Sequence, residues 1–408
     1  MTTTSLRIAW RNLWRHTQRT ILMIAIVAFG SWVILVMWGI ADGMIRSMTD
    51  TQIVYNLGDL QLRAVGYADD PVPSNGLTAK QVLAAQGVLT DAHIDASSAR
   101  LETSGMLRSS YGSDGVMIRG IDPNGEQRVT KLQETIVEGQ YIAGSGEILI
   151  SAKMAASLDI RLGERVVLLA QGESGTSSQA FRAVGFFASS LGTLDSMAAI
   201  SLQDAHAMSG WSGLTSIAIN LPAGASTRRN VSMLEKDLAT AGIKRIEVAD
   251  YFALNPFARI MIQGSTIKMI PMVIMIALMA GFGVAKTAFY SVLERTREFG
   301  MMMALGMSRK LLARVVLMES VFVSAIGFVV GGGVGYGCLM YLSRHGFSLG
   351  GLMANFSEAG IPTTLYASTS GWYWVAAFSV VVFTALVAAW YPARRARRLE
   401  PVVAIREG

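Results

Sequence analysis

The side chains that could perform catalysis are few and scattered. His93 and His206 each stand alone, and residues 42–268 contain neither an HExxH metal motif nor a Gly-x-Ser-x-Gly nucleophile elbow. The acidic pair Asp69–Asp70 lies among polar residues, a setting typical of solvated loops. One cysteine, Cys338, excludes an intramolecular disulfide framework and a cysteine-based metal cluster. We therefore expect no catalytic residue and no metal site in this chain.

Nucleotide chemistry is not expected either. A P-loop needs a lysine directly after a glycine to hold phosphates, and none of the eight lysines follows a glycine. The composition is 51% hydrophobic and 16% charged, with a mean hydropathy of +0.40. These values argue against disorder and against a basic arm for nucleic acid, because both require low hydrophobicity or clustered charge. We expect no nucleic-acid partner.

Four hydrophobic segments are long enough to cross a membrane, which takes about 20 mostly apolar residues. Their only charged residues are Lys286 and Glu319. Buried core helices are the alternative, but such long runs of so low a charge favour membrane spans. The first segment could also be a secretory signal, with Gly39 and Ala41 as its small residues, yet it exceeds the 7–15 apolar residues of a signal. The predicted spans are residues 21–41, 269–293, 315–343 and 371–392.

Basic residues flank these spans unevenly and predict their orientation. Arginines and lysines concentrate before the first span, between the second and third, and after the fourth. We therefore expect an inner-membrane protein with both termini cytoplasmic. The predicted parts are an N-terminal cytoplasmic segment (1–20), a large external domain (42–268), a cytoplasmic coupling loop (294–314), a short external loop (344–370) and a basic cytoplasmic tail (393–408).

The charge partition agrees with this topology. Residues 42–266 hold 23 acidic and 18 basic side chains, a net charge of −5. Because the whole chain has a net charge of +6, the remaining residues carry +11. Within this domain, short runs rich in Val, Ile and Phe alternate irregularly with helical patterns, which predicts an α+β fold. We expect strands at 58–64, 116–121, 147–151, 165–170, 181–187, 197–202, 215–221 and 245–248, helices at 78–86, 152–159, 203–209 and 226–241, and lobe boundaries near 105–120 and 205–215.

The segment between the second and third spans is the most informative. It is predicted to form a short amphipathic helix with Phe299, Met303 and Met307 on one face. Charged residues flank this helix, and Gly300 and Gly306 hold it in place. Such a helix could lie in the membrane interface. Alternatively, its apolar face could enter a groove of another protein, with the flanking charges Glu294, Arg297, Glu298 and Arg309 pairing there.

This segment, together with Ala9–Arg15 and Tyr391–Arg406, resembles the FtsX-like/MacB-like ABC transporter permease family. The order of parts, one span, a large external domain and three spans, matches over the full length. The segments 118–123, 137–139, 147–169 and 181–186 look most like the LolC and LolE lipoprotein-releasing permeases. Residues 171–180 depart from that pattern, because this Gly/Ser-rich link lacks the proline and aromatic anchors of a hook for a periplasmic carrier.

The resemblance implies a permease that transmits the motion of a separate cytoplasmic ABC ATPase dimer, which would bind ATP and Mg²⁺, and that pairs with a second permease subunit. Membrane lipid, a periplasmic carrier and a lipoprotein or other hydrophobic cargo are the further partners. MacB-like efflux of peptides or small molecules, and FtsX-type regulation of a cell-wall hydrolase without transport, are the alternatives. Carried over by position, the ATPase contact comprises Glu294, Arg297, Glu298, Phe299, Gly300, Met303, Ala304, Leu305, Gly306, Ser308 and Arg309.

Two further features concern the spans themselves. Charge inside a membrane is costly and hints at function, so we expect Lys286 and Glu319 to pair with each other, or Lys286 to snorkel to lipid phosphate. Gly327, Gly331 and Gly335 recur at four-residue spacing in the third span. Small residues at this spacing permit close helix packing.

Overall fold

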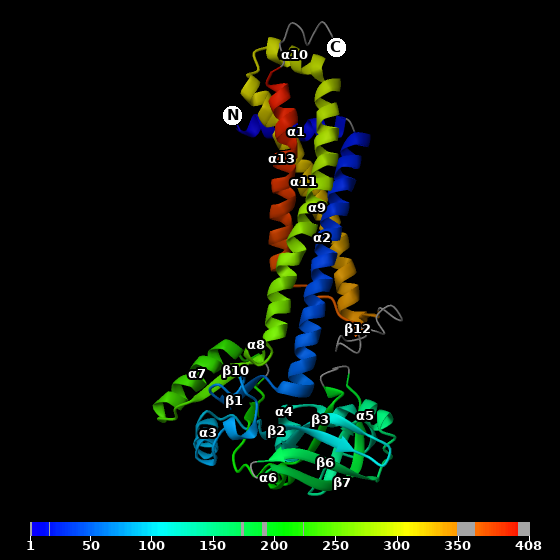
Figure 1. Ribbon diagram of the computed structural model, residues 1–408. Coiled ribbons are helices and arrows are strands. Elements are labelled where there is room, and N and C mark those ends of the chain that lie inside the picture. The colour runs from blue at the N-terminus through cyan, green and yellow to red at the C-terminus, as the bar shows by residue number, and fades with distance from the viewer. Residues whose placement is uncertain are drawn as a thin grey trace. The chain divides into compact units, whose positions relative to one another are not determined.

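The computed structural model describes residues 2–15, 17–172, 175–189, 194–222, 224–348 and 364–398. The described residues fall into two compact units (Figure 1). Residues 1–46, 262–347 and 364–408 contribute to a helical unit, and residues 47–261 contribute to an α+β unit. The segments 349–363 and 399–408, which belong to the expected external loop and basic tail, lie outside the described residues.

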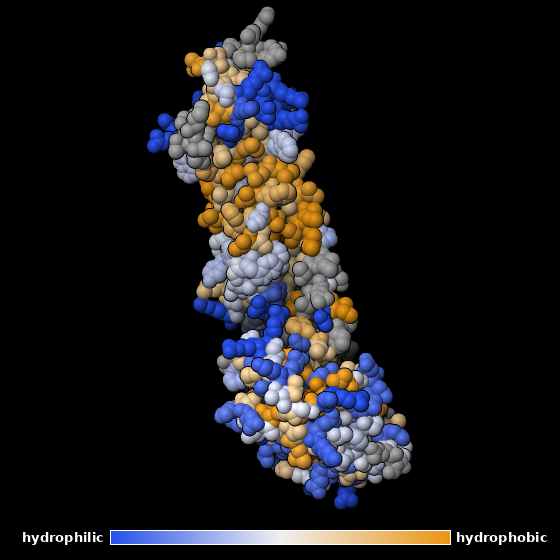
Figure 2. All heavy atoms as spheres, turned by 90° about the vertical axis from the view of Figure 1, so that its left-hand side faces the viewer, coloured by the Kyte–Doolittle hydropathy of each residue, from blue (hydrophilic) through white to orange (hydrophobic). Residues whose placement is uncertain are grey.

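Among the described residues, the helical unit and its borders contain six helices and two short strands. They are α1 (Thr2–Arg15), α2 (Thr17–Gln52), α9 (Pro256–Glu294), α10 (Thr296–Ala304), α11 (Arg309–His345), β11 (Phe347–Ser348), β12 (Thr364–Leu365) and α13 (Trp372–Ala396). By length and composition, the stretches Thr17–Leu57, Met269–Glu294, Arg309–His345 and Trp372–Ala396 could cross a membrane. Hydrophobic side chains form a band around this unit on the face shown in Figure 2. The predicted fold class, four membrane-spanning helices with an α+β domain between the first and second, is confirmed.

The first 20 residues form structure that the sequence did not indicate. Helix α1 is amphipathic and crosses the bundle (Figure 1). Two of its own residues, Ala9 and Leu13, are buried. Trp10 packs edge-on against Phe322 of α11, with ring centroids 5.6 Å apart. The Thr20 hydroxyl donates a hydrogen bond of 2.7 Å to the Leu13 carbonyl and so fixes the corner between α1 and α2.

Glycines bring α11 against α2. Gly327, Gly331 and Gly335 are buried on the side of α11 that faces α2. A Cβ at Gly331 would lie 2.0 Å from the Ala28 carbonyl oxygen, so the two backbones touch there. By contrast, Gly333 on the same helix has open space around it. The seam therefore depends on the absence of a side chain at particular positions.

We predict that Gly331→Ala destabilises the helical unit by about 1–3 kcal/mol, because the added methyl group forces α11 away from α2. The thermal unfolding midpoint of the detergent-extracted chain should fall. Gly333→Ala is the matched control, and it should leave the midpoint unchanged or raise it, because alanine favours helix. Equal effects of the two substitutions would contradict the close approach at Gly331.

The α+β unit is built on one ten-stranded sheet. Its strands are β1 (Leu60–Ala64), β2 (Ser97–Arg108), β3 (Ser113–Ile121), β4 (Ile136–Gly139), β5 (Glu147–Ser151), β6 (Arg165–Gly172), β7 (Gly175–Phe187), β8 (Met197–Ser201), β9 (Ser216–Ile219) and β10 (Ile246–Asp250). Its helical elements are η1 (Ile53–Leu57), η2 (Pro73–Asn75), α3 (Ala79–Asp91), α4 (Pro123–Val129), η3 (Leu132–Thr135), α5 (Ala152–Ser157), α6 (Leu202–Ser209), α7 (Thr227–Thr240) and α8 (Tyr251–Leu254).

Six of these strands close into a ring. The order along the path is β10-β1-β9-β2-β3-β8-β5-β7-β4, and β6 pairs with both β2 and β7. The pairs β3–β8 and β5–β7 are parallel, and the other pairs in the ring are antiparallel. Leu101, Ile118, Ile150, Val166 and Phe181 are buried in the main core of this ring. A second core lies beside β1, β9 and β10, where α3 and α7 supply Leu89, Leu234 and Leu238.

The predicted lobe boundary near 105–120 is wrong, because β2 belongs to both cores, whereas the one near 205–215 matches the passage from Met208 in the first core to Leu214 in the second. The first residues of β2, 97–100, pair with β9, and its last residues, 105–108, pair with β6. The change of partner falls inside one continuous strand that we did not predict, and 105–120 lies in the β2–β3 hairpin. The expected link at 171–180 is also mostly strand, since Gly172 pairs with Gly175 where β6 meets β7.

Candidate functional site

The element between α9 and α11 is a short helix followed by a tight turn. Helix α10 ends at Ala304, and Gly306 adopts a φ of +97°, a conformation that glycine accepts readily. The amide of Met307 donates to the Met302 carbonyl at 3.0 Å, which closes the turn. The Ser308 hydroxyl then accepts a hydrogen bond of 3.3 Å from the Leu311 amide and caps α11. The turn is therefore fixed on both sides.

The apolar face of α10 packs inside its own bundle. Phe299 is 1% exposed, and Gly300 is buried with it, whereas Met303 and Met307 are half-buried against the same cluster. The proposal that this face inserts into the groove of another protein is therefore wrong for Phe299 and Gly300, because the bundle already covers them. The residues around Phe299 in this cluster are Val292, Leu312, Ala313, Val316, Ala393 and Ala396.

A buried arginine holds α10 to the bundle. The Arg295 side chain is 5% exposed, and its guanidinium lies 5.0 Å above the Phe299 ring. Arg295 Nε lies 3.1 Å from a Glu298 carboxylate oxygen, and Nη1 lies 3.2 Å from a Glu319 carboxylate oxygen. One cation thus joins α10 to α11. Sequence reasoning overlooked Arg295, although its spacing of three residues from Glu298 is a recognised helical ion-pair spacing.

The acidic residues expected to meet a partner are paired within the chain. Arg15 at the end of α1 lies 3.0 Å from Glu298, and Arg19 forms an ion pair with Glu294. Both pairs connect the N-terminal helices to the α9–α10 corner. Glu294 and Glu298 therefore attach this element to the N-terminal helices, although Glu294 stays exposed.

The expected pair between Glu319 and Lys286 is not formed. The Glu319 carboxylate meets Arg295, while Lys286 is exposed on α9 and forms no ion pair among the described residues. The other alternative, in which Lys286 snorkels to lipid phosphate, stays a prediction.

The outward surface of the element is small and mixed. Leu305 is 89% exposed at the tip of the turn, and Met301 is 48% exposed one helical turn before it. Arg297 and Arg309 are exposed on either side. Of the eleven positions predicted as a contact, those on the outside are Glu294, Arg297, Ala304, Leu305, Gly306, Ser308 and Arg309.

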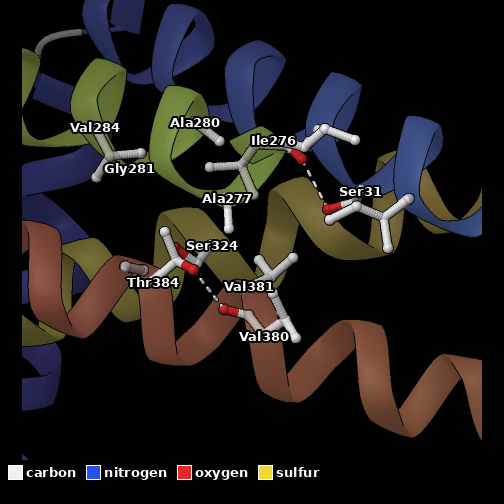
Figure 3. Close-up of a pocket in the computed structure, with 14 residues that line it drawn as sticks. Ser31, Ile276, Ala277, Ala280, Gly281, Val284, Ser324, Val380, Val381 and Thr384 are labelled. Carbon is white, nitrogen blue, oxygen red and sulfur yellow. Dashed lines mark hydrogen bonds between the residues drawn. The ribbon is translucent and has the colours of Figure 1, made fainter. Parts of the chain in front are cut away.

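The four long helices meet at a small cavity of about 20 Å³ (Figure 3). Ser31, Ser324 and Thr384 carry hydroxyls at this level, and each donates a hydrogen bond of 2.7–2.8 Å to a carbonyl of its own helix. These bonds therefore do not join one helix to another. The remaining lining is apolar and partly small, including Ala280 and Gly281 of α9.

In the α+β unit, two buried arginines bind the π-helical turn η1. Arg100 donates to the Leu57 carbonyl at 3.4 Å, and Arg119 donates to the Asn56 side-chain oxygen at 2.8 Å. Both arginines are at most 2% exposed. Because η1 leads into β1, these bonds attach the first turn of the α+β unit to strands β2 and β3.

Arg100 is neutralised by Glu126 in a fully buried pair. Two parallel hydrogen bonds of 2.6 and 3.0 Å join the guanidinium to the carboxylate, which also accepts bonds from Ser98 and Thr130. Burial alone would raise the pKa of Glu126, but the charge and hydrogen bonds of Arg100 outweigh it and hold that pKa below its ordinary value.

We predict that Glu126→Gln costs about 3–5 kcal/mol of stability at neutral pH, since it leaves Arg100 buried without a counter-charge. Because the folded-state pKa of Glu126 is lowered, its contribution is present above the unfolded value of about 4.3 and is lost as pH falls through the folded-state pKa. The gap in thermal midpoint between wild type and variant should therefore shrink on acidification. Glu134→Gln, at an exposed pair with Lys131, is the control and should change stability by less than about 1 kcal/mol. A gap that does not change with pH would refute the ionised pair.

These features define a multi-pass membrane protein in which a folded domain separates the first span from the other three. The chain matches the family described as MacB-like periplasmic core domain over residues 20–236, more than half of its length, and it belongs to that family. Residues 270–401 match the FtsX-like permease C-terminal family. Membership of the FtsX-like/MacB-like ABC transporter permease family, predicted from the sequence, is confirmed.

Curated relatives match over a limited region. The macrolide export ATP-binding/permease protein MacB of Hyphomonas neptunium is 32% identical over 128 residues, which is 31% of this chain and 17% of that protein. The pyoverdine export ATP-binding/permease protein PvdT of Pseudomonas fluorescens is 33% identical over 128 residues, with the same shares. The matched region thus spans about one sixth of each relative's length.

Two solved domains align with part of the chain. The periplasmic region of MacB from Actinobacillus actinomycetemcomitans aligns at 12% identity and a TM-score of 0.37, covering 49% of this chain and 92% of that one. The extracellular domain of the transporter YknZ from Gram-positive bacteria aligns at 16% identity and a TM-score of 0.34, covering 47% and 99%.

Proposed function

We propose that this chain is the membrane subunit of an ABC transporter and that it passes the motion of a separate ATPase to its α+β unit. The observation that carries the proposal is the α10 element: a short helix anchored by Arg295 whose tip presents Leu305, with Arg297 and Arg309 exposed beside it. The relatives are named as ATP-binding/permease proteins. Since no lysine of this chain follows a glycine, ATP and Mg²⁺ would be bound by the partner.

In this proposal the ATPase dimer binds at the tip of α10 and the first turn of α11, and two permease subunits pair in the inner membrane. The ends of α1 and α13 lie near α10 in the helical unit (Figure 1). Cytoplasmic placement of this end follows from its basic residues. The ion pairs of Arg295 and Arg19 would make α10 move with α9 and α11 as one body. At the small cavity, the hydroxyls of Ser31, Ser324 and Thr384 bond within their own helices, which would let the long helices slide past one another.

We expect Leu305→Asp to lower recovery of ATPase activity with the affinity-purified, detergent-extracted chain at least tenfold, because a charge replaces an exposed apolar anchor at an interface. Leu83→Asp is the matched control, since Leu83 is 71% exposed on α3 in the α+β unit. It should leave recovery unchanged. Full recovery with Leu305→Asp would place the ATPase contact elsewhere, and no ATPase with the wild-type chain would count against the transporter.

For the cargo, we propose a lipoprotein or another hydrophobic molecule taken from the outer leaflet or the periplasm. The segments that resemble lipoprotein-releasing permeases favour the first, and the relatives' names favour export of small molecules as the second candidate. The β6–β7 turn at Gly172 and Gly175 carries no proline or aromatic residue in its flanking sequence, which argues against a carrier hook of the lipoprotein-releasing type. A non-transporting regulator of a cell-wall hydrolase is the third reading.

The three readings predict different consequences of deleting the gene. Lipoprotein release predicts that mature lipoproteins accumulate in the inner membrane, measured by membrane fractionation. Efflux predicts an unchanged lipoprotein distribution and a lower tolerance of hydrophobic toxic compounds. Regulation of a hydrolase predicts cell-separation defects with neither change. We expect the first result, and either of the others would overturn the lipoprotein assignment.

A further inference from the structure

A concave apolar groove runs along the outside of the helical unit between α9 and α13. It has a volume of about 580 Å³, and its walls include Leu278 and Phe282 of α9 and Phe383 and Val387 of α13. Leu278, Phe282 and Phe383 are each 67–74% exposed. In a membrane-spanning helix such side chains face lipid, so the groove opens toward the hydrocarbon.

Small residues form the hollow between these larger side chains. Ala277, Gly281 and Ala285 line the groove from α9, and Thr384 and Ala388 line it from α13. A Cβ at Gly281 would lie 2.8 Å from the Thr384 methyl group, so the helices approach closely at the floor. The hollow is therefore built into the sequence of both helices.

Two aromatic rings lie beyond one end of the groove lining. Phe289 lies one helical turn beyond Ala285, and Tyr391 lies one turn beyond Val387, so each continues a lining stripe. The two rings stack with centroids 5.8 Å apart and an interplanar angle of 27°. The guanidinium of Arg395, one turn further along α13, lies 5.0 Å from the centroid of the Phe289 ring.

Arg395 brings a positive charge to this end. It is exposed, and among the described residues no carboxylate lies within ion-pair distance of it. A guanidinium that stacks by its face keeps its N–H edge available for phosphate oxygens. Arg394, Arg397 and Arg398 are exposed around it and add to the local positive charge.

The groove is long and ends near a charge, which favours an amphiphile over a helix. Met269 and Ala285 bound the lining along α9, a length of about 24 Å at 1.5 Å per residue. The Arg395 guanidinium lies beyond this apolar stretch, beside Phe289. A membrane-spanning helix of a second copy would be apolar along its length and would leave this cation without an anionic partner.

We propose that this groove holds one acyl chain of an anionic phospholipid, with Arg395 binding its phosphate. The apolar walls and the cationic end match the two parts of this amphiphile, and the stacked rings separate them. The lipid would come from the leaflet on the α10 side, since the end of α13 that carries Arg395 lies at the end of the unit where α10 is found (Figure 1). This site depends on the membrane-spanning fold and not on the identity of the cargo.

The test uses the full-length chain in detergent, incubated with mixed micelles of phosphatidylglycerol and phosphatidylcholine and analysed by native mass spectrometry. We expect the wild type to retain phosphatidylglycerol in preference to phosphatidylcholine. Arg395→Gln should lower phosphatidylglycerol affinity about fivefold, since one cation near an anionic lipid surface contributes about 1 kcal/mol. Ala285→Phe, which fills the groove, should lower retention with the arginine intact.

Two matched controls keep the result specific. Arg398→Gln removes a neighbouring exposed charge, and Met279→Phe enlarges an exposed α9 side chain outside the groove lining. Arg398→Gln should lower phosphatidylglycerol affinity less than Arg395→Gln does, Met279→Phe should retain lipid as the wild type does, and Arg395→Lys should recover part of the binding. Circular dichroism and size exclusion report whether each variant is folded.

Three outcomes would overturn the proposal. Equal retention of the two lipids would remove the role of the phosphate charge. Unchanged binding in folded Arg395→Gln and Ala285→Phe would place the lipid elsewhere. Loss of a dimer with Ala285→Phe, at unchanged lipid retention, would assign the groove to a second copy of the chain.

Discussion

The ion pairs of Arg295 with Glu298 and Glu319 set the arrangement at the α10 end of the helical unit. A guanidinium that is almost completely buried must be compensated, and here it takes one carboxylate from α10 and one from α11 while stacking on Phe299. The helix that presents Leu305 is therefore not an isolated loop. Its position follows from a charge buried among the helices that it connects.

The α+β unit uses the same device where the chain enters it. Arg100 of β2 and Arg119 of β3 are buried, and each ties the turn η1 to its strand through a carbonyl or amide oxygen. A π-helical turn leaves backbone groups to be satisfied locally, and arginine, with several donors in a fixed plane, suits that task. In each unit, an arginine paired with a carboxylate thus lies close to the end of a long helix. Arg295 directly follows Glu294, the last residue of α9, and Arg100 binds the turn that follows Gln52, the last residue of α2.

How much the sequence reveals depends on how local the deciding interaction is. Hydrophobic length alone located the spans, because nothing outside each segment is needed to keep it apolar. Strand β2 was missed because Arg100 and Glu102 look like surface residues until Glu126 and Arg119 are brought beside them by the fold.

The orientation of α10 is equally nonlocal. The stripe of Phe299, Met303 and Met307 would suit either a partner's groove or the chain's own bundle, and its neighbours in α11 and α13 decide in favour of the bundle. The exposed tip at Leu305 followed from position alone, since it lies at the end of the amphipathic stretch. The α9–α13 groove could not be inferred, because it arises from two helices that lie far apart in sequence.

The closed ring in the α+β unit leaves none of its six strands with a free edge. A strand at the edge of an open sheet can be peeled away one hydrogen bond at a time, whereas each strand of the ring is held along both sides. Strands β2 and β7 have three partners each: β3, β6 and β9 pair with β2, and β4, β5 and β6 pair with β7. Because Arg100 and Arg119 bind η1 from β2 and β3, this turn is attached to two strands that are each paired along both sides, whereas β10 stands at the end of the sheet with β1 as its partner.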